Sequence, residues 1–225
     1  MKGSVLVTGG ARRIGRAICE ALAARGWRVL AHSRDPGNPL CADFLRPDGA
    51  DRLFAAALAQ APDLCAVVNN AAVFSTAAEL PPGEVAALRA VNAEAPVRLA
   101  ELLAAHLAAR RATGAVVNLL DTRVAGAAAS SRKSLASSPY AASKLALARA
   151  TVAQARSLAP TLRVNGVAPG PVLPPADAAN REKGGAILLR RRPAPADVAA
   201  AVEFLLEAEA VTGQILAVDS GQCLL

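Results

Sequence analysis

The chain has 225 residues, of which 53% are hydrophobic and 19% charged, so it can bury a core and is not a disordered polymer. At roughly 150 residues per domain, this length favours a single domain over residues 1–225. The net charge is +7, but the cations are scattered and aromatic residues make up only 3%, which favours an anionic small-molecule ligand over a nucleic acid.

The cysteines and the apolar runs exclude further classes of protein. No CxxC pair occurs and no histidine lies close in sequence to a cysteine, so we predict no metal site and no disulfide framework. Buried small side chains are the expected role of Cys19, Cys41, Cys65 and Cys223. No uncharged apolar run reaches 18 residues and no signal peptide is evident, so we expect a cytoplasmic protein that spans no membrane.

Short apolar runs alternate with helical patterns along the chain. Strands are expected at 4–7, 27–31, 40–42, 65–68, 114–120, 162–167 and 214–218, and helices at 14–25, 51–60, 84–111, 138–158 and 196–208. This alternation is typical of a parallel sheet covered on both faces, so the predicted fold is α/β, a Rossmann-like doubly wound sheet. Ligands of such sheets bind at the carboxyl ends of the strands, where this sequence places Thr8, Asn69, Asp121 and Pro169.

The first strand is followed by a glycine-rich turn, Thr-Gly-Gly-Ala-Arg-Arg-Ile-Gly over residues 8–15. Small residues allow backbone N–H groups to approach a pyrophosphate, and the start of the next helix favours negative charge. The turn therefore predicts a dinucleotide site.

The end of the second strand selects between the two nicotinamide dinucleotides. An Asp or Glu there commonly binds the ribose hydroxyls of NADH. This chain instead has His32, Ser33 and Arg34, and Arg12 or Arg13 adds a further guanidinium. Because arginine pairs well with phosphate, we predict NADPH as the cofactor.

Tyr140 and Lys144 stand four residues apart in a predicted helix, so they lie one turn apart on the same face. An ammonium beside a phenol favours the phenolate, and we therefore expect Lys144 to lower the pKa of Tyr140 so that the tyrosine exchanges a proton near neutral pH.

These motifs, taken together, resemble those of the short-chain dehydrogenase/reductases. The glycine turn, Asn-Asn-Ala at 69–71, Asn92, Tyr-Ala-Ala-Ser-Lys at 140–144, Arg-Val-Asn-Gly-Val-Ala-Pro-Gly at 163–170 and the segment 211–221 occur in the family order over nearly the whole chain. The resemblance implies hydride transfer from a nicotinamide, with Tyr140 as proton donor and Lys144 binding the ribose. It also implies that Asn92 holds a proton-relay water, that Asn70 and Asp43 lie by the adenosine, and that the chain forms a homodimer or homotetramer.

Three departures from the usual family pattern are similar to the pteridine reductase and dihydromonapterin reductase branch: Arg13 replaces a glycine, Asp121 replaces a serine, and Phe74 follows the Asn-Asn-Ala motif. A pterin is flat, so Phe74 can stack on one face while Arg13 contacts it. We expect an apolar pocket to raise the pKa of Asp121 so that it relays a proton. The alternative hydroxyl partners of Tyr140 are Ser130, Ser131, Ser134, Ser137 and Ser138.

The predicted sites are then as follows. The catalytic residues are Tyr140, Lys144, Asp121 and Asn92. The cofactor-binding residues are Gly9, Arg12, Arg13, Ile14, Gly15, His32, Ser33, Arg34, Asp43, Phe44, Asn70, Ala71, Pro169 and Gly170. The substrate-binding residues are Arg13, Phe74, Asp121, Tyr140 and Pro171, with residues 171–192 as a substrate lid.

The function predicted from these residues is NADPH-dependent reduction of a pterin or dihydropterin at a C=N bond. One alternative is a carbonyl reductase of a 3-oxoacyl group or a small ketone, which would need a hydroxyl partner for Tyr140 and no aromatic clamp. The other is a non-catalytic regulator that binds a dinucleotide, against which the intact set of Tyr140, Lys144 and Asn92 argues.

Overall fold

The structure, a computed structural model, describes residues 2–125, 138–172 and 187–225. Six parallel strands form one sheet in the order β2-β1-β3-β4-β5-β6. Their bounds are β1 Ser4–Val7, β2 Arg28–Ala31, β3 Leu64–Asn69, β4 Gly114–Leu119, β5 Leu162–Pro169 and β6 Ile215–Val218. The α/β Rossmann-like fold is therefore confirmed.

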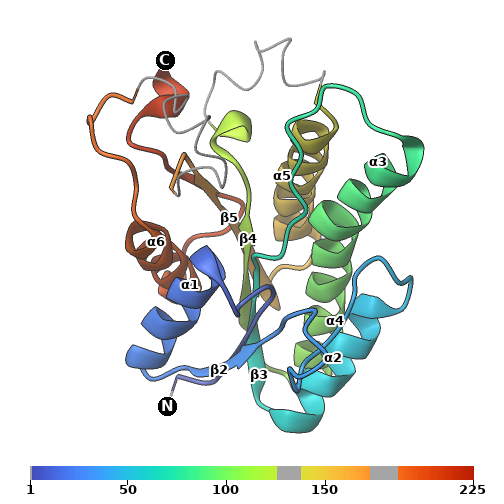
Figure 1. The fold of residues 1–225 in the computed structure, drawn as a ribbon. Coiled ribbons are helices and arrows are strands. Elements are labelled where there is room, and N and C mark those ends of the chain that lie inside the picture. The colour runs from blue at the N-terminus through green and yellow to red at the C-terminus, as the bar shows by residue number, and fades with distance from the viewer. Residues whose placement is uncertain (1, 126–137, 173–186) are drawn as a thin grey trace.

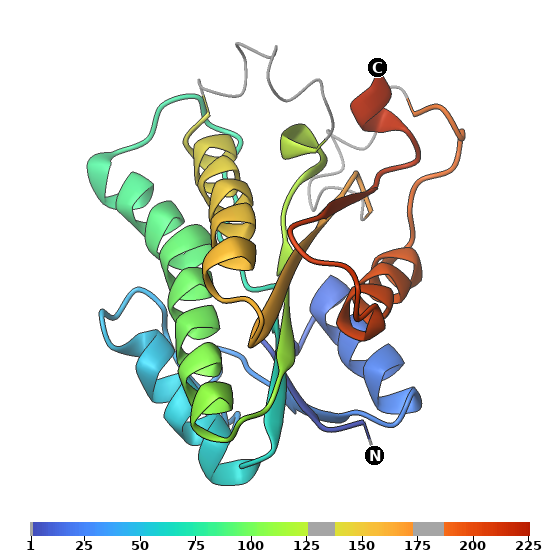
Figure 2. The same ribbon diagram turned by 180° about the vertical axis from the view of Figure 1, so that it is seen from behind.

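Helices cover both faces of this sheet, as Figures 1 and 2 show from opposite sides. The longer helices are α1 Arg13–Ala24, α2 Gly49–Gln60, α3 Pro82–Arg89, α4 Ala95–Ala109, α5 Pro139–Ser157 and α6 Pro195–Glu207. Helices α1 and α6 pack together on one face, while α2, α4 and α5 lie on the other. Among the described residues, no helix is both long and apolar enough to cross a membrane.

Strand β1 illustrates why the sheet is buried on both faces. Val5, Leu6 and Val7 are fully buried, yet their side chains point alternately to the two sides. Leu6 packs in the core beneath α2 and α4, whereas Val5 and Val7 pack in the core beneath α1 and α6. A continuous apolar run is therefore the pattern this strand requires.

Two predicted elements differ from the structure. The strand expected at 40–42 is only an isolated parallel bridge between Ser33 and Cys41. The long helix expected at 84–111 is α3 and α4 joined by a π-helical turn, η1, at Ala90–Glu94. Pro96 has no N–H to donate to the carbonyl of Asn92 four residues earlier, which breaks the α-helical hydrogen-bond pattern at this point.

A chain of buried side-chain hydrogen bonds ties α5 to the sheet. Asn69 Nδ2 donates to Asn118 Oδ1 at 2.8 Å, and Asn118 Nδ2 donates to Thr151 Oγ1 at 2.9 Å. Thr151 in turn donates to the carbonyl of Leu147 on its own helix. Because β3, β4 and α5 are linked in this way, the position of α5 relative to the strand ends is fixed by specific contacts.

Replacing Thr151 with Val keeps the shape of the side chain but leaves the Asn118 amide without its acceptor. We expect the free energy of unfolding to fall by about 1–3 kcal/mol, the cost of an unsatisfied buried donor. Urea denaturation measures this change. The matched variant Thr161→Val, at a half-buried threonine, should change stability by less than about 0.5 kcal/mol. Equal effects at the two positions would contradict the role given to the network.

Candidate active site

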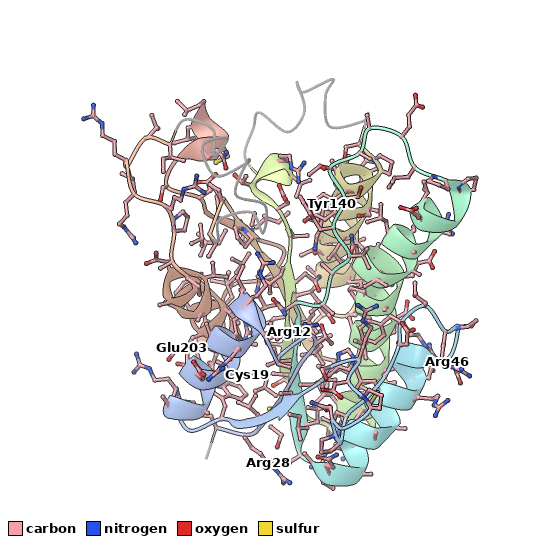
Figure 3. The ribbon with its side chains drawn as sticks, viewed as in Figure 1. Arg12, Cys19, Arg28, Arg46, Tyr140 and Glu203 are labelled. Atoms are coloured by element: carbon pink, nitrogen blue, oxygen red, sulfur yellow. The ribbon has the colours of Figure 1, made fainter. Side chains whose placement is uncertain are left out.

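The polar side chains that follow the strands gather at the carboxyl edge of the sheet. Thr8 follows β1, Asn70 follows β3 and Asp121 follows β4, with Gly170 just past β5. In Figure 3, Tyr140 lies at the start of α5 near this edge, and Arg12 lies at the start of α1. Arg28 marks the opposite end of the sheet. Among residues 2–125, 138–172 and 187–225, no three metal-ligating side chains come together.

The glycine turn is held against β3 by hydrogen bonds. Asn70 Nδ2 donates to the carbonyls of Thr8 and Gly9 at 2.9 and 3.1 Å, and the Thr8 hydroxyl accepts from the backbone N–H groups of Asn70 and Ala71. Gly15 is required here, since a Cβ at this position would lie 2.2 Å from the carbonyl oxygen of Gly9. Asn70 thus shapes the turn, in addition to its expected place near the cofactor.

His32 supports this turn from behind and supplies no positive charge. Its ring accepts a hydrogen bond at Nδ1 from the Gly9 N–H at 3.2 Å, and Nε2 lies 3.1 Å from the carbonyl oxygen of Ala42. Burial lowers the pKa of His32, as does the charge of Arg34, so the ring is neutral and donates from Nε2. The neutral His32 therefore adds no cation for a cofactor phosphate, and its ring fixes the turn.

The exposed cations near the turn are arginines. Arg12 and Arg13 begin α1 and Arg34 follows β2, and all three are exposed. Arg13 has φ of 53°, the left-handed region, which costs a non-glycine residue about 1–2 kcal/mol. The family usually has glycine here, so this chain retains the glycine-like backbone while adding a guanidinium. Ile14 and Ser33 are half-buried beside these cations.

The loop after β2 supplies two further predicted residues. Phe44 is buried, with its ring 4.9 Å from that of His32. Asp43 is half-buried, and its Oδ1 accepts from the N–H of Leu45. No helix separates β2 from this loop.

Tyr140 and Lys144 stand one turn apart on α5, and both are almost fully buried, with 7% and 3% of their surfaces exposed. Lys144 Nζ donates to the carbonyl of Leu119 at 2.8 Å. The Tyr140 ring meets that of Phe74 edge to face, with centroids 4.8 Å apart. Phe74 itself is 63% exposed, so it is not a core residue.

Asp121 is bound by Arg123, a residue that sequence reasoning missed. Arg123 Nε donates to Oδ1 at 2.8 Å and Nη2 donates to Oδ2 at 2.9 Å, a bidentate pair. The Arg123 backbone N–H adds a third hydrogen bond to Oδ1. The Arg123 guanidinium also lies 5.0 Å from the centre of the Tyr140 ring. The Asp-x-Arg spacing directly after a strand was the available signal.

The expected pKa shifts of Tyr140 and Asp121, a lowered pKa for the tyrosine and a raised one for the aspartate, are both wrong. Burial raises the pKa of Tyr140 and the charge of Asp121 raises it further, although Arg123 opposes both. Burial alone would raise the pKa of Asp121, but hydrogen bonding and charge from Arg123 outweigh it, so the net pKa is lowered. Burial lowers the pKa of Lys144 to about 8. At neutral pH, Tyr140 is therefore a protonated phenol and Asp121 a carboxylate.

The side-chain amide of Asn92 makes three hydrogen bonds. Its Oδ1 accepts from the N–H of Val73 at 2.8 Å, and its Nδ2 donates to the carbonyl of Val73 and to Ser143 Oγ at 3.0 Å. Ser143 in turn donates to the Tyr140 carbonyl. The amide of Asn92 therefore positions the segment that carries Phe74 and the first turn of α5. Ser143 is a second residue that sequence reasoning missed.

Not every predicted site residue can be placed. Of the alternative hydroxyl partners, Ser130, Ser131, Ser134 and Ser137 lie outside the described residues, as does most of the lid at 171–192. Ser138 is half-buried at the start of α5. Pro169 ends β5, and Gly170 and Pro171 follow it at the same edge, where a Cβ on Gly170 would lie 2.8 Å from Asp219.

Comparisons with known proteins agree with this architecture. A family model described as Enoyl-(Acyl carrier protein) reductase matches residues 9–222. The chain is 30% identical to dihydromonapterin reductase of Enterobacter sp. (strain 638) over 238 residues, which cover 97% of this chain and 95% of that protein. It is 31% identical to carbonyl reductase family member 4 of Danio rerio over 240 residues, which cover 98% of each.

A solved structure extends the likeness to three dimensions. FolM alternative dihydrofolate reductase 1 from Brucella canis, in complex with NADP, is 33% identical, with a TM-score of 0.83 over 99% of this chain and 95% of that one. The family model and these relatives together span the glycine turn, the Asn-Asn-Ala segment and the Tyr-Lys helix. The chain belongs to the short-chain dehydrogenase/reductase family, with its resemblance to the pterin-reducing branch borne out by these relatives.

Proposed function

We propose that this oxidoreductase reduces a C=N bond of a pterin or dihydropterin with NADPH. The observation that carries the proposal is the Asp121 carboxyl, bound through both oxygens to the Arg123 guanidinium that also faces the Tyr140 ring. This contact lowers the pKa of Asp121, which leaves it a carboxylate. A carboxylate only accepts hydrogen bonds, so it suits a ring that offers N–H groups, as the amino group and ring nitrogens of a pterin do. A simple ketone offers only lone pairs, which a carboxylate repels.

The aromatic residue next to Tyr140 fits the same class of substrate. Phe74 presents most of its ring to solvent and contacts Tyr140 edge to face. A flat heterocycle stacked on Phe74 would then lie within reach of the Tyr140 hydroxyl and of Asp121. Resemblance to the dihydromonapterin reductase and FolM proteins points in the same direction.

The residues at the glycine turn fit a phosphorylated dinucleotide. The start of α1 has neither a side-chain cap nor an acidic residue in its first turn, so its N–H groups suit a pyrophosphate. Arg12, Arg13 and Arg34 are exposed there and suit the additional phosphate of NADPH. The Brucella canis relative holds NADP in its crystal structure.

The chemistry divides between cofactor and protein. NADPH, when bound, supplies a hydride to the carbon of the C=N bond. Tyr140 donates its hydroxyl proton to the nitrogen, which becomes N–H. Asp121 orients the ring by accepting from its N–H groups. Lys144, whose pKa is about 8, is mostly cationic at neutral pH and lies one turn from the phenolate that remains.

Carbonyl reduction is the second candidate, favoured by the likeness to carbonyl reductase family member 4 of Danio rerio. Both reactions use the same tyrosine and lysine. They differ in what Asp121 and Phe74 contribute, so a comparison of substrates distinguishes the two reactions.

Steady-state oxidation of NADPH should be faster with dihydrobiopterin than with small ketones or a 3-oxoacyl thioester. Tyr140→Phe should lower kcat with dihydrobiopterin about 10²–10⁴-fold, because the proton donor is lost, while the NADPH dissociation constant measured by fluorescence stays unchanged. Turnover of ketones alone would favour the carbonyl reductase, and unaltered turnover in Tyr140→Phe would exclude the assigned proton donor.

Tyr140 is the only tyrosine in the chain, so the ultraviolet absorbance of phenolate reports on it alone. Because burial and Asp121 raise its pKa, the folded protein without ligand should form phenolate only above pH 10, whereas the unfolded chain should titrate near 10. In Asp121→Asn the pKa of Tyr140 should fall, since the charge of Asp121 no longer raises it. Phenolate forming near pH 7 in the unliganded protein would overturn this assignment.

Phe74→Ala should weaken dihydropterin binding through the loss of an aromatic contact worth about 0.5–1.5 kcal/mol, which raises KM about 2- to 12-fold. The value of KM for NADPH should not change. Phe204→Ala is the matched control, because Phe204 is also more than half exposed but lies on α6. The same rise in KM for both variants would show that Phe74 has no specific contact with the substrate.

A further inference from the structure

Arg123 is held rigidly where it meets both reacting side chains. It lies in the short helix η2, Thr122–Val124, directly after β4. The Thr122 hydroxyl donates to the Asp219 carboxylate, which also accepts from the backbone N–H groups of Gly221 and Cys223. The turn carrying Arg123 is thereby anchored to the C-terminal segment.

The position of Arg123 differs from that of an ordinary surface ion pair. Its guanidinium makes two hydrogen bonds to Asp121, whose side chain is only 17% exposed, and faces the Tyr140 ring at 5.0 Å. An exposed pair such as Arg98 with Asp51 has a similar short contact, 2.6 Å, but both side chains are more than 40% exposed. Although the Arg123 side chain is 38% exposed, its direct hydrogen bonds to the largely buried Asp121 place the cation against the carboxylate without water between them.

We propose that Arg123 is a positioning residue for the reaction: it holds Asp121 as a carboxylate oriented toward the substrate and stabilises the Tyr140 phenolate after proton transfer. The inference rests on the proposed function and deepens it, because it explains how Asp121 is kept as the carboxylate that accepts hydrogen bonds from an N–H-bearing ring. Among the described residues, the titratable or charged groups that act on Asp121 and Tyr140 are Arg123 on η2 and Lys144 on α5, besides the two residues themselves.

The charge balance explains why the arginine is needed. Burial alone disfavours an ionised Asp121, and the charge of Lys144 favours its ionisation less than Arg123 does. Without the guanidinium, the carboxyl would take up a proton as the pH falls and would become a donor at one oxygen. The same loss would remove the cation that favours the phenolate of Tyr140.

The decisive experiment is the pH profile of kcat/KM for dihydrobiopterin between pH 5 and 9, measured for wild type, Arg123→Met and Arg123→Lys. Wild type should show no acid limb from Asp121, because its pKa lies below the range tested. Arg123→Met should gain an acid limb, with activity falling about tenfold per pH unit below the new pKa. Arg123→Lys keeps the charge and should move the profile less.

Two controls separate this role from a structural one. Arg98→Met removes an arginine from an exposed ion pair and should leave the profile unchanged. In the double variant Arg123→Met with Asp121→Asn, the new acid limb should vanish, because the titrating group is gone. Superimposable profiles for wild type and Arg123→Met, or a limb that survives in the double variant, would overturn the proposal.

A measurement without turnover keeps the inference separate from the proposed function. The carboxyl carbon shift of Asp121, followed by NMR of labelled protein and assigned with Asp121→Asn, should titrate at higher pH in Arg123→Met than in wild type. If dihydrobiopterin is not reduced but this shift occurs, the proposed substrate fails while the charge role of Arg123 stands. If dihydrobiopterin is reduced and the shift does not occur, the role of Arg123 fails. If Arg123→Met does not fold, Arg123→Gln, which also removes the charge, gives the same comparison.

Discussion

A parallel sheet buried on both faces confines polar chemistry to its edges. In β1, Val5, Leu6 and Val7 present apolar side chains to both helical layers. All six strands point the same way, and the residues that follow them therefore meet at one edge. The glycine turn, Asn70, Asp121 and the start of α5 share this edge although they are distant in sequence.

Within that edge, the charge states result from competition between burial and neighbouring charges. Burial disfavours the ionised forms of Tyr140, Asp121 and Lys144 alike. Asp121 is kept ionised because Arg123 lies in direct contact with it, and Lys144, with a pKa of about 8, stays mostly cationic at neutral pH, whereas Tyr140 stays protonated. The protonated phenol beside a carboxylate is therefore a product of the whole cluster, and it suits the donation of a proton to an N–H-bearing ring.

Patterns of a few neighbouring residues were sufficient to predict much of the fold and part of the site. The glycine turn, the helix with Tyr140 and Lys144, and the strand ends lie where the sequence predicts them, because their signals span only a few residues. The helix around Asn92 was predicted as continuous because the apolar periodicity runs through it. That periodicity does not report the backbone hydrogen bond that is lost at Pro96. The strand at 40–42 was predicted from an apolar run that forms only one bridge to Ser33.

The amino-acid sequence by itself determined the class of fold, the family and the identity of the tyrosine, lysine and aspartate at the site. Tertiary structure alone decided their protonation and their partners. A pKa depends on burial and on contacts that the fold creates, so the neutral state of His32 and the balance between burial and Arg123 at Asp121 emerge only in the folded chain. For the same reason Arg123, two residues from Asp121 in the chain, acquires its significance only when α5 brings the Tyr140 ring beneath it.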